Sequence, residues 1–322
     1  IDWLGALMWG LVLLCILFVC VYGEHYDWYQ SFQIRAATVI GILILVLNLW
    51  RASFIRHPFI ALKTWTYRAV WFPFILYMVI DILLAPSHLF EHLYMESILG
   101  YDTLNVISLN WAVLLGIIVG AGFTFFTFSR RKWRYKTMTV IAFSSITGYL
   151  MYFYFGIDYA LPKETLFVPL FLRSFGYVII AICFLTVLSR VPFQHFFQAV
   201  SVQSFVSAGF GGALGTAILG HALNGAMKKN SMLLGSVVDH VNPFISRIPV
   251  GEVYGAVQQQ ALMVSMKELY GWLTLMALFC LLAFLVYESD IRPYKVLHPT
   301  YRSIRRFVKH ELRIDKKLEA TA

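Results

Sequence analysis

Apolar segments of bilayer length recur along this chain, and this pattern constrains the fold more than any other feature of the sequence. The hydrocarbon core of a bilayer is about 30 Å thick, so a membrane-spanning helix needs about 20 mainly apolar residues. Backbone polar groups in lipid must be hydrogen-bonded within the protein, which favours helices. We therefore predict an all-α polytopic integral membrane protein with eight spans, at roughly Trp3–Tyr22, Ile34–Trp50, Val70–Met95, Thr103–Phe128, Met138–Phe155, Thr165–Leu188, Phe193–Leu223 and Tyr270–Tyr287.

The composition agrees with this prediction. The chain is 59% hydrophobic and 13% charged, whereas soluble domains are about 25% charged. The four cysteines lie inside apolar runs without paired spacing, so we interpret them as small packing residues rather than disulfides or metal ligands. We expect no metal, no cofactor and no enzymatic activity.

The basic residues predict the orientation. If the tail is cytoplasmic, 19 of the 26 Lys and Arg residues lie on the cytoplasmic side and 6 on the other. This asymmetry follows the positive-inside rule, so we predict a multi-pass protein of the inner (cytoplasmic) membrane with both ends of this chain cytoplasmic. The net charge of +9 is then a topology signal with some attraction to the lipid bilayer, and we expect no nucleic-acid partner.

The third span contains an unusual set of titratable residues. At 100° per residue, Asp81, His88, His92 and Glu96 fall within about 80° of one another, with Glu91 off to one side. Pro73 and Pro86 should bend this helix. An acid at mid-membrane with titratable groups leading outward suits a proton pathway; alternatively, Asp81 is a structural residue and the outer groups are interfacial.

The same stretch permits a second hypothesis. The letters HLFEH at 88–92 match the H-x-x-E-H pattern of zinc peptidases. His88 and His92 would then bind zinc while Glu91 activates water. No third ligand can be named, so a membrane zinc peptidase is the more remote reading.

Arg173 lies inside the sixth predicted span, about 12 Å of helix from Thr165. An arginine near the bilayer centre costs roughly 2.5–3.5 kcal/mol on insertion scales, so its side chain should face protein or water. We expect Arg173 to modulate Asp81 electrostatically or to be its structural partner.

Small residues spaced four apart predict close helix packing. One pair is Gly116 and Gly120; the seventh span carries two more ridges, formed by Gly211 with Gly215 and by Ala208, Gly212, Thr216 and Gly220. Gln194 and Gln198 begin that span on one face and either line a cavity or seat another helix.

The sequence divides into three parts. We predict two linker helices in 1–65, a six-helix unit in 66–290 and a basic tail in 291–322. The segment 224–268 is too polar to span and predicts a long external loop, either a helical hairpin or a surface-lying helix.

Several motifs in this order resemble one transporter family. They are DWLG with YGEHYDWYQS near the start, YMESILGYD at 94–102, LFVPLFLRSFGYVI around Arg173, and FGGALGTAILG at 210–220. The chain resembles the C-terminal part of a major facilitator superfamily transporter, in the fourteen-helix drug:proton antiporter branch of the multidrug-resistance protein B type. The resemblance covers the two linker helices and the second six-helix half, and Arg173 falls on that family's arginine.

The resemblance implies a proton-coupled exporter of lipophilic drugs or other small toxic molecules, working by alternating access between two halves. The implied partners are the missing N-terminal half, protons and a small-molecule substrate, together with a periplasmic adaptor and an outer-membrane channel in a Gram-negative source. We expect Ile1 to lie in the middle of a longer protein. Two alternatives stay open: a facilitator exporting a siderophore, lipid or metabolite, and a non-transporting scaffold or channel.

Overall fold

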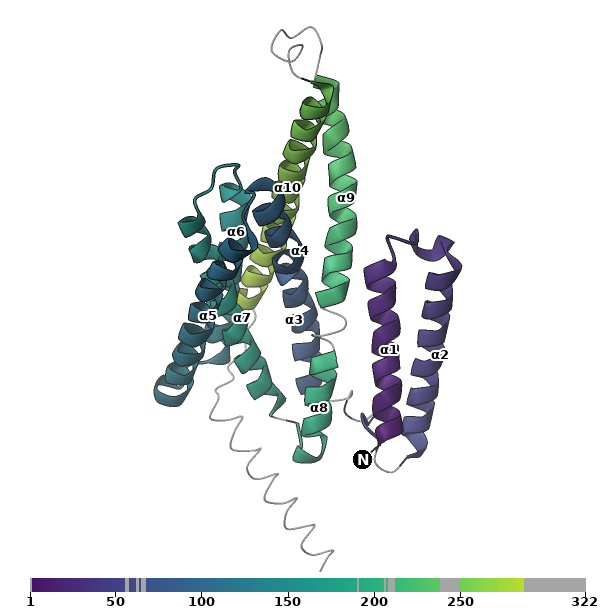
Figure 1. Cartoon of the computed structure of the whole chain (residues 1–322). Coiled ribbons are helices and arrows are strands. Elements are labelled where there is room, and N and C mark those ends of the chain that lie inside the picture. Colours follow the sequence, from purple (N-terminus) through teal and green to yellow (C-terminus); the bar gives the residue numbers. More distant parts are fainter. Residues whose placement is uncertain are drawn as a thin grey trace, which may run out of the picture.

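The computed structural model describes residues 2–55, 58–61, 64, 68–189, 191–205, 207, 212–237 and 249–286. Within these ranges the chain is helical and contains no strand (Figure 1). The helices are α1 (Trp3–Tyr22), α2 (Phe32–Phe54), α3 (Arg68–Leu84), α4 (Pro86–Leu93), α5 (Thr103–Phe126), α6 (Tyr135–Gly156), α7 (Phe167–Leu188), α8 (Phe193–Phe205), α9 (Gly212–Val237) and α10 (Val250–Val286). The predicted all-α polytopic fold is confirmed.

Seven helical segments in the described ranges are long and apolar enough to cross a membrane. They correspond to seven of the eight predicted spans. The remaining predicted span, Phe193–Leu223, differs from the prediction because α8 ends at Phe205 and α9 begins at Gly212. Between these two helices only Ser207 is described.

The third span is interrupted where the sequence predicts a bend. Proline has no backbone N–H and cannot continue the hydrogen-bond ladder of α3, so Pro86 begins a new helix, α4. The amide of Ala85 instead donates to the carbonyl of Ile82 at 3.3 Å. A π-helical turn over Tyr94–Ile98 then ends the span.

The segment 224–268 is largely helical in its described residues. α9 continues to Val237, and α10 is a single helix of 37 residues, about 55 Å long at 1.5 Å per residue. The two helices lie side by side and extend beyond the ends of the others (Figure 1). A buried hydrogen bond of 2.9 Å from Asn230 Nδ2 to Ser265 Oγ joins them. Of the two arrangements that the sequence left open, this is the hairpin.

One large core joins α3 to α7 with α9 and α10. Its largest fully buried side chains include Phe90, Tyr94, Phe143, Tyr149 and Tyr270. Many apolar side chains on the outer faces are exposed, such as Ile118 on α5 at 62% and Phe279 on α10 at 72%. Helices with apolar side chains both inside and outside suit a lipid environment.

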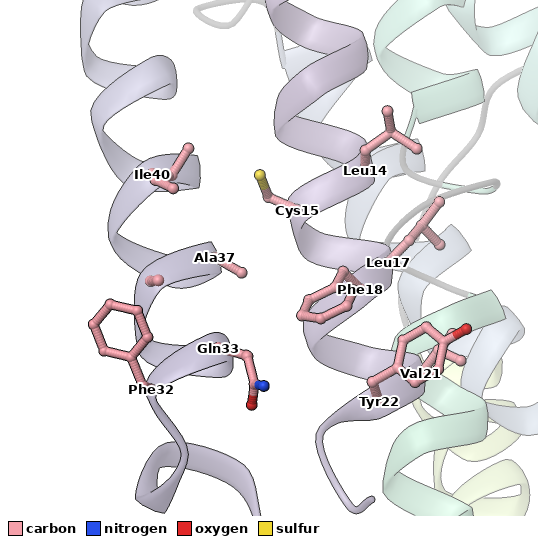
Figure 2. Close-up of a pocket in the computed structure, with 11 residues that line it drawn as sticks. Leu14, Cys15, Leu17, Phe18, Val21, Tyr22, Phe32, Gln33, Ala37 and Ile40 are labelled. Carbon is pink, nitrogen blue, oxygen red and sulfur yellow. The ribbon is translucent and has the colours of Figure 1, made fainter. Parts of the chain in front are cut away.

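α1 and α2 form a hairpin at the side of the bundle, with α1 next to α9 (Figure 1). The two helices border an apolar groove of ≈ 700 Å³, shown in Figure 2. Its walls include Leu14, Phe18 and Val21 of α1 with Phe32 and Ile40 of α2. Such an apolar face suits contact with lipid.

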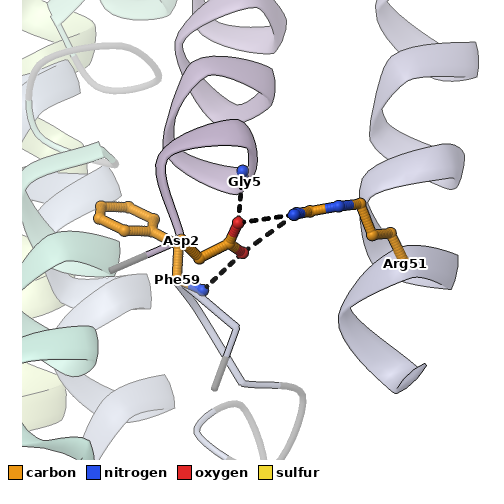
Figure 3. Close-up of polar contacts among 4 residues, drawn as sticks. All are labelled: Asp2, Gly5, Arg51 and Phe59. Atoms are coloured by element: carbon orange, nitrogen blue, oxygen red, sulfur yellow. Dashed lines mark hydrogen bonds and ion pairs between the residues drawn. The ribbon is translucent and has the colours of Figure 1, made fainter. Parts of the chain in front are cut away.

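A polar clasp fixes the start of this hairpin (Figure 3). The carboxylate of Asp2 accepts bonds from both Nη atoms of Arg51, at 2.8 and 3.1 Å, and caps α1 by accepting from the Gly5 amide at 2.9 Å. The Phe59 amide donates to the same carboxylate at 3.1 Å. The bond from Arg51, supported by the two amides, lowers the pKa of Asp2 from 3.8 to about 2. The clasp therefore ties α1, α2 and the connector after α2 together.

Candidate functional site: a buried ion pair beside a polar cavity

The deep arginine of α7 is paired with a glutamate of α4. Arg173 Nη1 donates to Glu91 Oε2 at 2.7 Å, and the two side chains are 17% and 8% exposed. Removing a charge from water is costly, and a buried pair is tolerated only when its remaining hydrogen-bonding groups are satisfied. Arg173 thus faces protein, as predicted from the cost of its depth.

The second oxygen of Glu91 is satisfied from a third helix. The Tyr149 hydroxyl of α6 donates to Glu91 Oε1 at 2.7 Å. Tyr270 of α10 closes the cluster, because its ring stacks on Phe153 with centroids 5.2 Å apart and meets Phe90 edge-on at 5.6 Å. Side chains from α6 and α7 therefore hold the Glu91 carboxylate in one position, next to aromatic packing from α10.

Arg173 also borders a cavity of ≈ 350 Å³ between α3, α4, α5 and α7. Part of its wall is polar and part is apolar. The lining residues are Asp81, Leu84, Ser87, His88, Val113, Ile117, Arg173, Ser174, Tyr177, Ser207 and Gly212. Ligand pockets commonly have this size range and combine apolar walls with a few polar groups.

Asp81 is the cavity residue whose hydrogen bonding is incomplete. Its side chain lies in a residue that is 9% exposed, and its Oδ2 atom is buried without a hydrogen-bond partner among the described residues. The structure describes no ion pair between Asp81 and Arg173, because Arg173 pairs with Glu91. The structural partner of Arg173 is therefore Glu91 and not Asp81, while electrostatic modulation of Asp81 by Arg173 stays a prediction. A buried polar group without a partner costs free energy, and such groups often have a role in function.

The expected ladder of Asp81, His88, His92 and Glu96 is divided. Asp81 and His88 line the same cavity. His92 Nε2 and Glu96 Oε1 lie 3.1 Å apart on more exposed surface, with side chains 63% and 48% exposed, and neither lines the cavity. Distance along the span separates them, because His92 and Glu96 lie 11 and 15 residues beyond Asp81, about 16 and 22 Å at 1.5 Å per residue.

Gln198 does not line the cavity and instead bonds to the connector after α2. Its Nε2 atom donates to the Pro58 carbonyl at 3.1 Å, and its Oε1 atom accepts from the Thr64 hydroxyl at 2.8 Å. These bonds hold the connector after α2 against α8. The side chain of Gln194 lies outside the described residues.

Two of the glycine ridges are close helix contacts. A Cβ atom added at Gly116 would lie 2.7 Å from the Phe171 carbonyl oxygen, and one at Gly120 would lie 3.1 Å from that of Phe175, so α5 and α7 meet backbone to backbone. Gly215 of α9 makes a similar contact with α3, 3.3 Å from the Asp81 carbonyl oxygen.

The other small residues of the α9 ridges contribute less. Added Cβ atoms at Gly212 and Gly220 would have their nearest neighbours at 3.8 and 3.9 Å, which is ordinary contact. Ala208 and Gly211 lie outside the described residues.

The zinc-peptidase hypothesis required Glu91 to activate water. Both of its carboxylate oxygens instead accept hydrogen bonds from Arg173 and Tyr149, and His92 is engaged with Glu96. No group of three or more His, Cys, Asp or Glu side chains suited to a metal ion occurs in the part of the chain that the structure describes. The hydrogen bonds from Arg173 and Tyr149 favour an ion-pairing role for Glu91 over a catalytic one.

Comparison of the sequence with protein-family models and with curated proteins finds no match. The family resemblance drawn from the motifs therefore stays a prediction. The chain is an all-α polytopic protein whose bundle encloses a buried ion pair and a polar cavity.

Proposed function

We propose that this chain is part of a membrane transporter that exports lipophilic small molecules in exchange for protons. The observation that supports this best is Asp81, whose Oδ2 atom has no partner among the described residues and which borders a ≈ 350 Å³ cavity among helices of membrane-spanning length. Ionisable groups inside spans commonly mark ion and substrate pathways.

Each part of the site has a role in this proposal. Asp81 takes up a proton when the cavity opens to one side and releases it when the cavity opens to the other. Arg173 and Glu91 form a fixed pair beside it, at 2.7 Å. The close backbone contacts at Gly120 and Gly215 would be the places where helices move past one another during alternating access.

The proposal includes the setting of the chain. The chain lies in the cell (inner) membrane with both of its ends on the cytoplasmic side. An N-terminal half beside it completes the transporter. A periplasmic adaptor and an outer-membrane channel are further proposed partners in a Gram-negative cell.

The experiment is proton-driven flux of a lipophilic substrate in inverted membrane vesicles that contain the full-length protein. Asp81→Asn should abolish flux driven by a pH gradient and leave the amount of protein in the membrane unchanged, because asparagine cannot exchange a proton. Asp2→Asn is the matched control, since Asp2 lies outside the cavity in the clasp with Arg51. Undiminished flux in Asp81→Asn would remove Asp81 from the mechanism.

A further inference from the structure

The charges around the cavity are not balanced. The charged and titratable residues that line it, apart from Tyr177, are Asp81, His88 and Arg173. The positive charge of Arg173 is offset at 2.7 Å by Glu91, which does not itself line the cavity. Asp81 has no described partner. With His88 neutral, a ligand in the cavity meets one uncompensated negative charge.

The Glu91 carboxylate, which offsets the charge of Arg173, is fixed in place by hydrogen bonds. Its two oxygens are bonded to Arg173 and Tyr149, both at 2.7 Å, and it is 6% exposed. A charge fixed in this way, out of contact with water, acts on the cavity at full strength because low-dielectric surroundings screen it weakly.

We propose that Glu91 is the specificity-determining residue of the cavity: by neutralising Arg173 it makes the site select small amphiphilic monocations, such as protonated arylalkylamines. The ammonium group would donate to the free oxygen of Asp81, and the apolar body would contact Leu84, Val113 and Ile117. This inference rests on the proposed function in taking the cavity as the substrate site. It adds the charge class of the substrate and the residue that sets it.

The substitutions shift the charge in opposite directions. Glu91→Gln frees the charge of Arg173, so the cavity should change from preferring cations to accepting carboxylates. Arg173→Gln leaves Glu91 uncompensated, so the preference for cations should strengthen. The double variant Glu91→Gln/Arg173→Gln removes both charges and should return to the preference of the unmodified chain.

The test measures binding of three probes of nearly equal shape by equilibrium dialysis of the full chain in detergent micelles, with empty micelles as the reference. The probes are 2-phenylethylammonium, 2-phenylethanol and 3-phenylpropionate. At pH 8 the carboxyl group of the third probe is ionised and the amino group of the first is protonated, while ordinary imidazoles are neutral. We expect the ammonium to bind about 10-fold or more tighter than the alcohol, as befits a hydrogen bond to a charged group, and the carboxylate to bind most weakly.

In Glu91→Gln the carboxylate should gain about 10-fold and the ammonium should lose a similar factor. Arg51→Gln, which breaks the pair with Asp2 outside the cavity, is the matched control and should leave all three affinities unchanged. If Glu91→Gln does not fold, Arg173→Gln tests the inference through the opposite shift. An unchanged ratio of ammonium to carboxylate affinity in whichever of these two variants folds would overturn it, as would a lack of charge preference in the unmodified chain.

The binding test and the flux test can contradict the two proposals independently. An absence of proton-driven flux together with the expected order of affinities would contradict the transport proposal and support the role of Glu91. Flux without any charge preference would support transport and contradict the role of Glu91.

Discussion

Removing one partner of the Glu91–Arg173 pair should destabilise the protein far more than removing both. Arg173→Met leaves the Glu91 carboxylate at 6% exposure with one of its two hydrogen bonds. Breaking a buried pair from one side costs about 3–5 kcal/mol, because the remaining charge stays buried and uncompensated. We therefore expect Arg173→Met to lower the free energy of unfolding by about 3–5 kcal/mol.

The matching double variant tests the cause of this loss. Glu91→Gln/Arg173→Met contains no buried charge at this position, and replacing a whole buried pair by uncharged side chains is often neutral.

Tyr149→Phe removes one hydrogen bond to the charged carboxylate and should cost about 1.5–3 kcal/mol in the presence of Glu91.

The assay is unfolding in mixed micelles with increasing sodium dodecyl sulfate, followed by far-ultraviolet circular dichroism. A double-mutant cycle gives the coupling energy between residues 91 and 173, which we expect to be at least about 3 kcal/mol, because Arg173→Met alone costs about 3–5 kcal/mol and the double variant is nearly neutral. A coupling energy below about 0.5 kcal/mol, or a loss in Arg173→Met of less than about 1 kcal/mol, would refute the buried pair.

Two further predictions concern packing and pH. Gly116→Ala should destabilise the protein by about 1–3 kcal/mol in the same unfolding assay, because the new Cβ atom would lie 2.7 Å from a backbone oxygen of α7. Gly122→Ala is the control, since Gly122 has open space around it, and this change should be neutral or stabilising. Equal effects of the two substitutions would contradict the close contact between α5 and α7. Since its pKa in the folded chain is about 2 rather than 3.8, Asp2 contributes stability that is fully present above pH 3.8 and is lost as the pH falls towards 2. The free energy of unfolding, measured as the pH is lowered, should show this decrease in the unmodified chain, and the decrease should be absent in Arg51→Gln.

Much of the fold could be predicted because the bilayer limits the choices. Helix length and apolar content located seven spans, from Trp3–Tyr22 to the C-terminal half of α10. The prediction was least successful for the seventh span, Phe193–Leu223, where the structure has α8 ending at Phe205 and α9 beginning at Gly212. α9 is also stabilised by contact with α10, for example through Asn230 and Ser265, and such tertiary pairing leaves little trace in a hydropathy profile.

The candidate site could be predicted only in part. The cost of burying Arg173 indicated correctly that it faces protein, and Asp81 and His88 do share a cavity. Glu91 was placed off the polar face, and it does lie outside the cavity that Asp81 and His88 share, where it pairs with Arg173. One available signal was that a deep arginine needs a carboxylate, and the third span offers only Asp81 and Glu91 in its apolar part. The choice between them depends on how α4 and α7 pack, which no local pattern encodes.

Proton exchange at Asp81 requires that water reach the cavity, inside a bundle whose outer faces meet lipid. The most direct test of this requirement is cysteine accessibility in intact membranes, with the four native cysteines replaced by alanine. Ser87 lines the cavity, whereas Ile118 of α5 is 62% exposed on the outside of the bundle. Ser87→Cys should react with a charged methanethiosulfonate reagent and Ile118→Cys should not; equal reactivity, or reaction at Ile118→Cys alone, would contradict the account.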